Sequence, residues 1–90
     1  MWEITQKPWH VANPEKICIS VRNSDTGDEM TFCITNIAAN DSFGVPDTPE
    51  NAEDQLLKHL QRLADLAFHK KQEDPDWDTI ISKDLRNWLV

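Results

Sequence analysis

The chain has 90 residues, with 16 acidic side chains against nine basic ones, and its formal net charge is −7. Binding of phosphate groups requires patches of Lys and Arg, which this chain lacks, so its composition argues against nucleic acid and membranes as partners. The length predicts one domain over residues 1–90, and hydrophobic (39%) and charged (28%) contents are those of a folded protein.

The first residues contain neither a basic segment nor an apolar one, and no apolar run is long enough to span a bilayer. We therefore expect a cytoplasmic protein without a secretion signal. In that compartment Cys18 and Cys33 are expected to stay reduced, as small side chains beneath another element. A structural disulfide and a redox pair are the alternatives.

The N-terminal segment Trp2–Thr5 alternates apolar and polar side chains and can form a third strand beside the hairpin described next. Pro8 restricts that strand to an edge of the sheet or ends it, because proline has no backbone N–H to donate.

Two longer segments, 16–23 and 29–37, alternate apolar and polar residues with the period of a β-strand. Turn-forming residues at 24–28, with a glycine among them, join the two strands into a β-hairpin. Keeping the apolar residues on one face predicts a register that pairs Val21 with Met30, Ile19 with Phe32, Ile17 with Ile34, and Cys18 with Cys33.

The segment 38–47 is predicted to be a loop, and Thr48-Pro49-Glu50 then carries the signals of a helix start. Threonine can cap the helix, proline suits its first position, and acidic residues complement its dipole. An apolar stripe predicts one long helix facing the core, with Leu56, Leu60, Leu63 and Ala67 at its centre.

A second helix is predicted from Pro75, after the capping residue Asp74. Its apolar stripe consists of Trp77, Ile81, Leu85 and Trp88, with Leu89 at the margin. A short strand over 79–82, followed by a final helical turn, is the less favoured alternative.

Together these elements predict an α+β fold, in which an antiparallel β-hairpin or three-stranded sheet is followed by two helices packed on one face. The opposite face of the sheet carries Ser20, Thr31 and Thr35. We expect this half-polar face to be open to solvent or to a partner.

No catalytic constellation emerges from the sequence, so we expect no enzyme, no cofactor and no metal site. The alternative is a small ligand-binding domain or enzyme that uses Asp84 and His59. Asp84 is the polar residue on the stripe of the second helix, where an apolar setting would mark a site. Its structural interpretation is an ion pair with Lys or Arg.

Four residues are candidates for contact with a partner: Leu66, His59, Trp2 and Trp9. Leu66 lies off the apolar stripe of its helix, beside His59, and would mark a binding or dimer face if it were exposed. Trp2 and Trp9 either pin the N-terminal segment over the core or serve as exposed anchors for a partner.

The order of these pieces resembles a family of short bacterial proteins described as a domain of unknown function. The similar pieces are a cysteine-bearing hairpin with Gly27 before its second strand, and Asp47-Thr48-Pro49-Glu50 at the start of a Leu-rich helix. They cover 16–21, 27–35 and 47–67. The resemblance implies a fold, and it implies no activity or functional residues.

We expect a small acidic non-enzymatic protein that binds a protein partner with a basic surface, as an accessory protein or inhibitor. Phage or mobile-element inhibitors of host defence systems and toxin-immunity proteins have this size and charge. A structural homodimer, pairing edge strands or the Leu66 face, is the alternative that needs no second protein.

Overall fold

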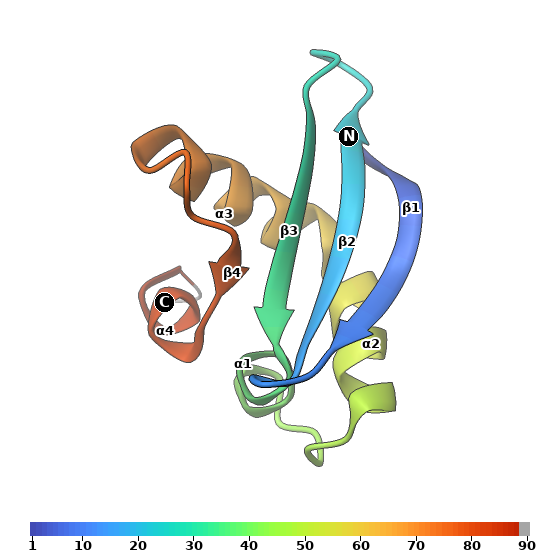
Figure 1. Cartoon of the computed structure of the whole chain (residues 1–90), viewed down its shortest axis with the longest axis vertical. Helices are drawn as coiled ribbons and strands as arrows, with labels where there is room; N and C mark the ends of the chain where they lie inside the picture. The colour runs from blue at the N-terminus through green and yellow to red at the C-terminus, as the bar shows by residue number, and fades with distance from the viewer. Residues whose placement is uncertain (89–90) are drawn as a thin grey trace.

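The computed structural model describes residues 1–88 and has an α+β fold, as predicted. One sheet has the strand order β1-β2-β3-β4, with β1, β2 and β3 antiparallel and β4 parallel to β3. In Figure 1, α2 and α3 lie behind the three long strands, and the other face of the sheet is turned toward the viewer. The elements are β1 (Trp2–Val11), β2 (Lys16–Asn23), β3 (Glu29–Thr35), α1 (Asn36–Ser42), α2 (Pro49–Lys58), α3 (Leu60–Glu73), β4 (Thr79–Ile80) and α4 (Ser82–Trp88).

The β2–β3 hairpin has the predicted register. Val21 pairs with Met30, Ile19 with Phe32, Ile17 with Ile34, and Cys18 with Cys33. Because paired residues share a face, the aliphatic side chains of both strands point toward the helices. The hairpin therefore supplies one wall of the hydrophobic core.

The first strand, β1, is an edge strand, and it is longer than the predicted segment. Its pairing with β2 shifts between Ile4 and Gln6 and again between Gln6 and Trp9. Pro8 falls in the second irregular stretch, where the missing N–H is tolerated. The strand continues past this proline to Val11, at the end of the sheet that meets α2.

The core lies between the sheet and the helices. Leu56, Leu63 and Leu85 are fully buried there, as predicted, and Leu60 packs against them partly buried. The predicted core positions of Ile81 and Trp88 are wrong, because these side chains are 46% and 38% exposed.

The long helix predicted from Pro49 is divided at His59. α2 ends at Lys58 and α3 begins at Leu60, with His59 in a non-helical conformation between them (φ −110°, ψ 24°). The imidazole of His59 stacks on the ring of Phe43, with 3.8 Å between ring centroids. This contact with a distant loop residue accompanies the break, and the break redirects α3 across the sheet.

The predicted loop over 38–47 contains a helix, α1. Thr35 caps it, since its hydroxyl oxygen accepts a hydrogen bond from the Ala38 amide at 3.1 Å. Ala38 and Ala39 are fully buried, and their small side chains let α1 pack against α2 and α4. The prediction missed α1 because its seven residues are too few for a clear periodic pattern.

The helix predicted from Pro75 is wrong, and the less favoured strand-then-helix alternative is confirmed in outline. Residues 75–76 form a turn, Thr79 and Ile80 pair with β3 as β4, and a helix follows from Ser82. The free edge of β3 accepts this strand, and the Cys33 amide also donates to the Asp78 carbonyl at 2.7 Å. The predicted role of Leu89 lies outside the described residues.

The open face of the sheet carries the disulfide Cys18–Cys33, so the expectation of reduced thiols is wrong for this structure. The register places the two residues directly opposite each other. Beside them Ser20 and Thr31 share a hydrogen bond of 2.7 Å between their hydroxyl groups. No helix covers this face in Figure 1, which agrees with its predicted half-polar character.

Candidate functional site

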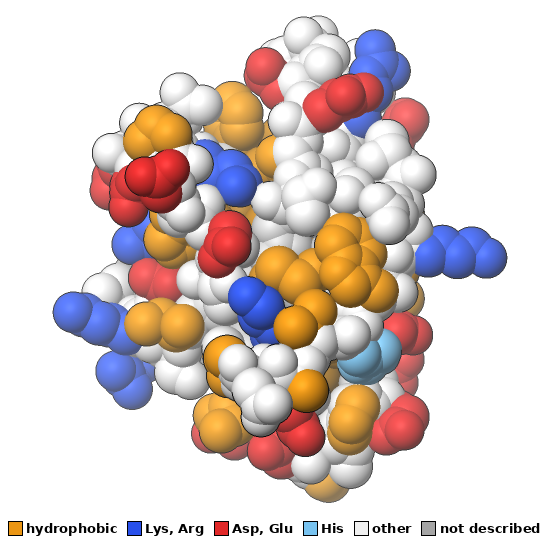
Figure 2. Space-filling view, viewed as in Figure 1, with side chains coloured by type: hydrophobic (Ala, Val, Ile, Leu, Met, Phe, Trp, Pro, Cys, Tyr) orange, Lys and Arg blue, Asp and Glu red, His pale blue; other side chains and the backbone are white. Residues whose placement is uncertain are grey.

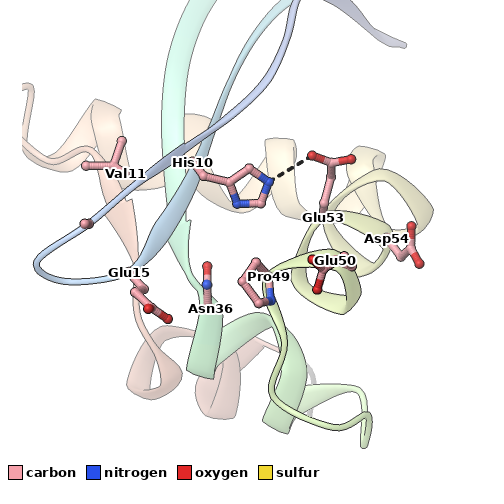
Figure 3. Close-up of a pocket in the computed structure, with 9 residues that line it drawn as sticks. His10, Val11, Glu15, Asn36, Pro49, Glu50, Glu53 and Asp54 are labelled. Carbon is pink, nitrogen blue, oxygen red and sulfur yellow. Dashed lines mark hydrogen bonds and ion pairs between the residues drawn. The ribbon is translucent and has the colours of Figure 1, made fainter.

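A cleft of about 450 Å³ opens where the end of β1 faces the start of α2 (Figure 3). Its residues come from the last residues of β1, the β1–β2 turn, the first residue of α1 and the first turns of α2. They are His10, Val11, Ala12, Glu15, Asn36, Pro49, Glu50, Glu53 and Asp54.

The start of α2 brings three acidic residues to one side of this cleft. Thr48 caps the helix by accepting from the Asn51 amide at 3.1 Å, and Pro49 occupies the first turn. Unpaired N–H groups at a helix start favour acidic side chains in the following turns. The same local preference that starts the helix therefore lines the cleft with Glu50, Glu53 and Asp54.

The opposite side of the cleft adds Glu15 and His10. Figure 3 shows His10 and Glu53 pointing toward each other, with 3.1 Å between the imidazole Nε2 and the carboxylate Oε1. Among the described residues that line the cleft, four are carboxylates and none is Lys or Arg. The cleft therefore has a local excess of negative charge.

Figure 2 shows how charge is distributed over the face that carries the open side of the sheet. A histidine and several acidic side chains lie toward the lower end of β1 and α2, and Lys and Arg side chains lie over α3 and α4 as well as at the middle, right and top of this face. Lys70, Lys71, Lys83 and Arg86 belong to those two helices. The charge of the chain is thus uneven, because the acidic cleft is lined by four carboxylates and these two helices carry the four cations.

Asn36 forms part of the cleft wall, and it is only 4% exposed. Its backbone amide donates to the Glu15 carbonyl at 3.0 Å, which fixes α1 to the β1–β2 turn. Its side-chain oxygen, Oδ1, is buried and has no hydrogen-bond partner within the described residues. Such an unpaired buried acceptor is uncommon in folded proteins.

A second hollow of about 560 Å³ adjoins the acidic cleft, and Glu15 and Asn36 line both. The second hollow is more apolar, because the exposed side chains of Ile37 and Ile81 contribute to it. Lys83 and Arg86 stand among its lining residues, so the two neighbouring hollows differ in charge.

Two of the four predicted contact residues are buried in the core. Leu66 is 2% exposed, so it does not mark a binding or dimer face. Trp2 is 4% exposed, and its indole Nε1 donates to Asp65 Oδ1 at 2.8 Å. Trp2 therefore takes the other role considered for it, because it pins the N-terminal strand to α3.

The other two predicted contact residues lie at or near the surface. Trp9 pairs with Cys18 and so lies on the open face of the sheet, partly buried. His59 is partly buried beneath Phe43. Burial lowers the pKa of His59 below its ordinary value, and the neighbouring charges of Lys58 and Arg62 lower it further.

Asp84 has structural partners, and it shares none of them with His59. Asp84 Oδ1 lies 3.1 Å from the Lys70 ammonium, and Oδ2 accepts from the Ile81 amide at 3.0 Å. The second bond is one of the two bonds of a capping box at the start of α4, because a side chain in the first turn accepts from the amide of the residue before the helix. Asp84 therefore ties α4 to α3, which agrees with its structural interpretation.

The sequence patterns did not single out His10, Glu15 or Asn36, which complete the acidic cleft. The acids of α2 were visible in the sequence, but their place at a helix start already accounted for them. Asn36 carries no local signal, because its importance depends on tertiary contacts with the β1–β2 turn and α2.

Within residues 1–88, no three His, Cys, Asp or Glu side chains are grouped so that they could hold a metal ion. The described helices also include none with the length and apolar character of a membrane-spanning segment. No protein-family model, curated protein or solved structure matches this chain. The resemblance to short bacterial proteins of unknown function therefore stays a prediction.

Proposed function

We propose that this chain is a non-enzymatic accessory protein or inhibitor that binds a basic surface of another protein through the acidic cleft. The observation that carries the proposal is the lining of that cleft by four carboxylates, with no Lys or Arg among its described residues. A hollow of one sign of charge concentrates ligands of the opposite sign and steers their approach.

The shape of the site supports a side chain as the bound group. A cleft of about 450 Å³ is the size of a pocket for a small group, and its walls come from three separate segments of the chain. One basic side chain entering this cleft would contact carboxylates from α2 and from the β1–β2 turn together. Inhibitors of host defence systems and immunity proteins are the kinds of binding protein whose size and charge this chain shares.

A pull-down with paired charge variants tests this function. The cleft variant, Glu15→Gln with Glu50→Gln, removes two carboxylates that line the cleft. The control, Glu3→Gln with Asp76→Asn, changes the net charge equally at two exposed acids elsewhere. Immobilised protein of each kind is incubated with bacterial lysate at low and high salt.

We expect the unchanged protein and the control to recover a basic protein at low salt and to lose it at high salt, because salt screens exposed charges. The cleft variant should fail to recover it at either salt concentration. Recovery of no salt-sensitive protein, or equal recovery by the two variants, would contradict the proposal.

A further inference from the structure

We propose that the acidic cleft is a subsite for arginine, in which Asn36 Oδ1 accepts a hydrogen bond from the guanidinium of an arginine of the bound partner. This inference rests on the proposed function, because it names the chemistry of the group that enters the cleft. Carboxylates alone would attract any cation, so the inference depends on an observation independent of the acidic cluster.

That observation is the unpaired amide oxygen of Asn36. The side chain is held at the start of α1, where Thr35 caps the helix and the Asn36 backbone amide is bonded to Glu15. Figure 3 shows the amide between Glu15 and Pro49, with its oxygen directed toward the side of the cleft that bears His10. No group in the described part of the chain donates to this oxygen.

A second buried asparagine, Asn40, also has a side-chain oxygen without a hydrogen-bond partner among the described residues, and the two differ in their position relative to the cleft. The side-chain amide of Asn40 donates to Asp47 Oδ1 at 2.8 Å and to the Thr48 carbonyl at 3.0 Å. Asn40 therefore anchors the loop before α2, and it is not among the cleft residues. Asn36 lines the cleft, and its acceptor is left for a donor from outside the chain.

Guanidinium fits this arrangement better than ammonium. The oxygen is screened from solvent, so the donor has to reach the inner wall of the cleft. A guanidinium is flat, weakly hydrated and carries five N–H donors in a fixed fork, so one edge can bond an amide oxygen while others face carboxylates. The lysine ammonium is a compact, strongly hydrated charge, which favours the outer carboxylates over the buried oxygen.

Charge balance in the cleft favours a cation near Asn36. Glu53 already faces His10 at 3.1 Å, which leaves Glu15, Glu50 and Asp54 as lining carboxylates without an ion-pair partner among the described residues. A guanidinium at Asn36 lies between the segments that carry Glu15 and Glu50, since Asn36 is bonded to the Glu15 backbone and Glu50 follows Pro49.

Nuclear magnetic resonance titration of the ¹⁵N-labelled full chain tests the inference with defined probes. The probes are N-acetyl-arginine methylamide and N-acetyl-lysine methylamide, which have the same charge and differ in the cationic group. We expect a Kd for the arginine probe about tenfold lower, which corresponds to one additional charge-assisted hydrogen bond. The Asn36 side-chain NH₂ signals should shift with the arginine probe and stay unchanged with the lysine probe.

The variant Asn36→Leu replaces the amide by an apolar group of similar shape and removes the acceptor. We expect the arginine probe to lose its advantage, while the Kd of the lysine probe changes less than twofold. If this variant does not fold, the ratio of the two Kd values and the Asn36 signals of the unchanged protein still decide the matter.

Equal affinity of the two probes in the unchanged protein overturns the arginine subsite, but it leaves the proposed binding of a basic partner intact. Retention of the arginine preference in Asn36→Leu overturns it too. Binding of neither probe also overturns the inference, and the pull-down with the paired charge variants separately decides the proposed function.

Discussion

Trp2 is predicted to be one of the strongest single contributors to the stability of this fold, although it is the second residue of the chain. Its side chain is 4% exposed, its ring centroid lies 5.6 Å from that of Phe68, and its indole N–H bonds Asp65. A buried tryptophan removes roughly 200 Å² from water, which stabilises by about 5 kcal/mol as an upper estimate. Trp2→Ala should therefore lower the free energy of unfolding by about 4 kcal/mol.

A further variant separates the contribution of the aromatic ring from that of the hydrogen bond. Trp2→Phe keeps an aromatic ring near Phe68 and loses the N–H donor, so we expect a cost of about 1 kcal/mol. Because Asp65 is exposed, water can replace the lost donor. The backbone of Trp2 keeps its two bonds to Gln61 in every variant, at 2.7 Å and 2.8 Å.

Urea unfolding followed by circular dichroism measures these costs, with Trp88→Ala as the matched control. Trp88 is 38% exposed, so its removal should cost about 1 kcal/mol or less. Equal losses for Trp2→Ala and Trp88→Ala would refute the reasoning, because they would show that the N-terminal strand adds little to the core.

Three other predictions concern stability. Loss of the disulfide, by reduction or in the double variant Cys18→Ala with Cys33→Ala, should lower the free energy of unfolding by about 3 kcal/mol, because the bond closes a loop with a sequence separation of 15. Urea unfolding curves with and without reductant measure this loss, and coincident curves would contradict the prediction. The folded-state pKa of His59 is lowered, so the unfolded chain binds the proton more readily, and stability should fall as pH drops below the ordinary pKa of 6.5. Thermal melts across pH should show a shallower slope in His59→Phe, and an unchanged slope would rule out this residue as the cause. Asp84→Ala removes the partner of Lys70 and the cap of α4, so it should lower the free energy of unfolding by about 1–3 kcal/mol. Lys70→Met leaves the cap in place and should lower it less. Melting temperatures in the opposite order would contradict this account.

The parts of the fold that depend on local pattern were predictable, and the hairpin is the clearest case. Its register follows from keeping Ile17, Ile19 and Val21 on one face with their partners, because a shift by one residue would expose all of them. The start of α2 was equally visible, since Thr48 and Pro49 act through neighbouring backbone groups.

The parts that depend on distant contacts were not predictable from the same patterns. The apolar stripe continues across His59 without a proline or glycine, and the break accompanies stacking on Phe43. Asp74-Pro75 looks like a helix start, yet the chain turns there and its next residues pair with the free edge of β3.

The residues of the candidate site also differ in whether the sequence indicated them. Glu50, Glu53 and Asp54 were visible as an acidic helix start, although nothing local indicated that they face a cleft. Asn36 could not be singled out, because only the packed structure shows a buried amide oxygen without a donor.

The parallel pairing of β4 with β3 has a consequence for the order in which this chain folds. The β2–β3 hairpin needs only neighbouring residues, whereas β4 reaches the other edge of β3 after α1, α2 and α3 have intervened. Non-local strand pairing forms late, because the intervening chain has to be ordered first. During synthesis the edge of β3, with Ile34 on it, therefore stays open until residues 79–80 arrive, and an unpaired edge invites pairing with another chain. We expect that arrested chains ending before Thr79 aggregate, whereas chains that include α4 do not.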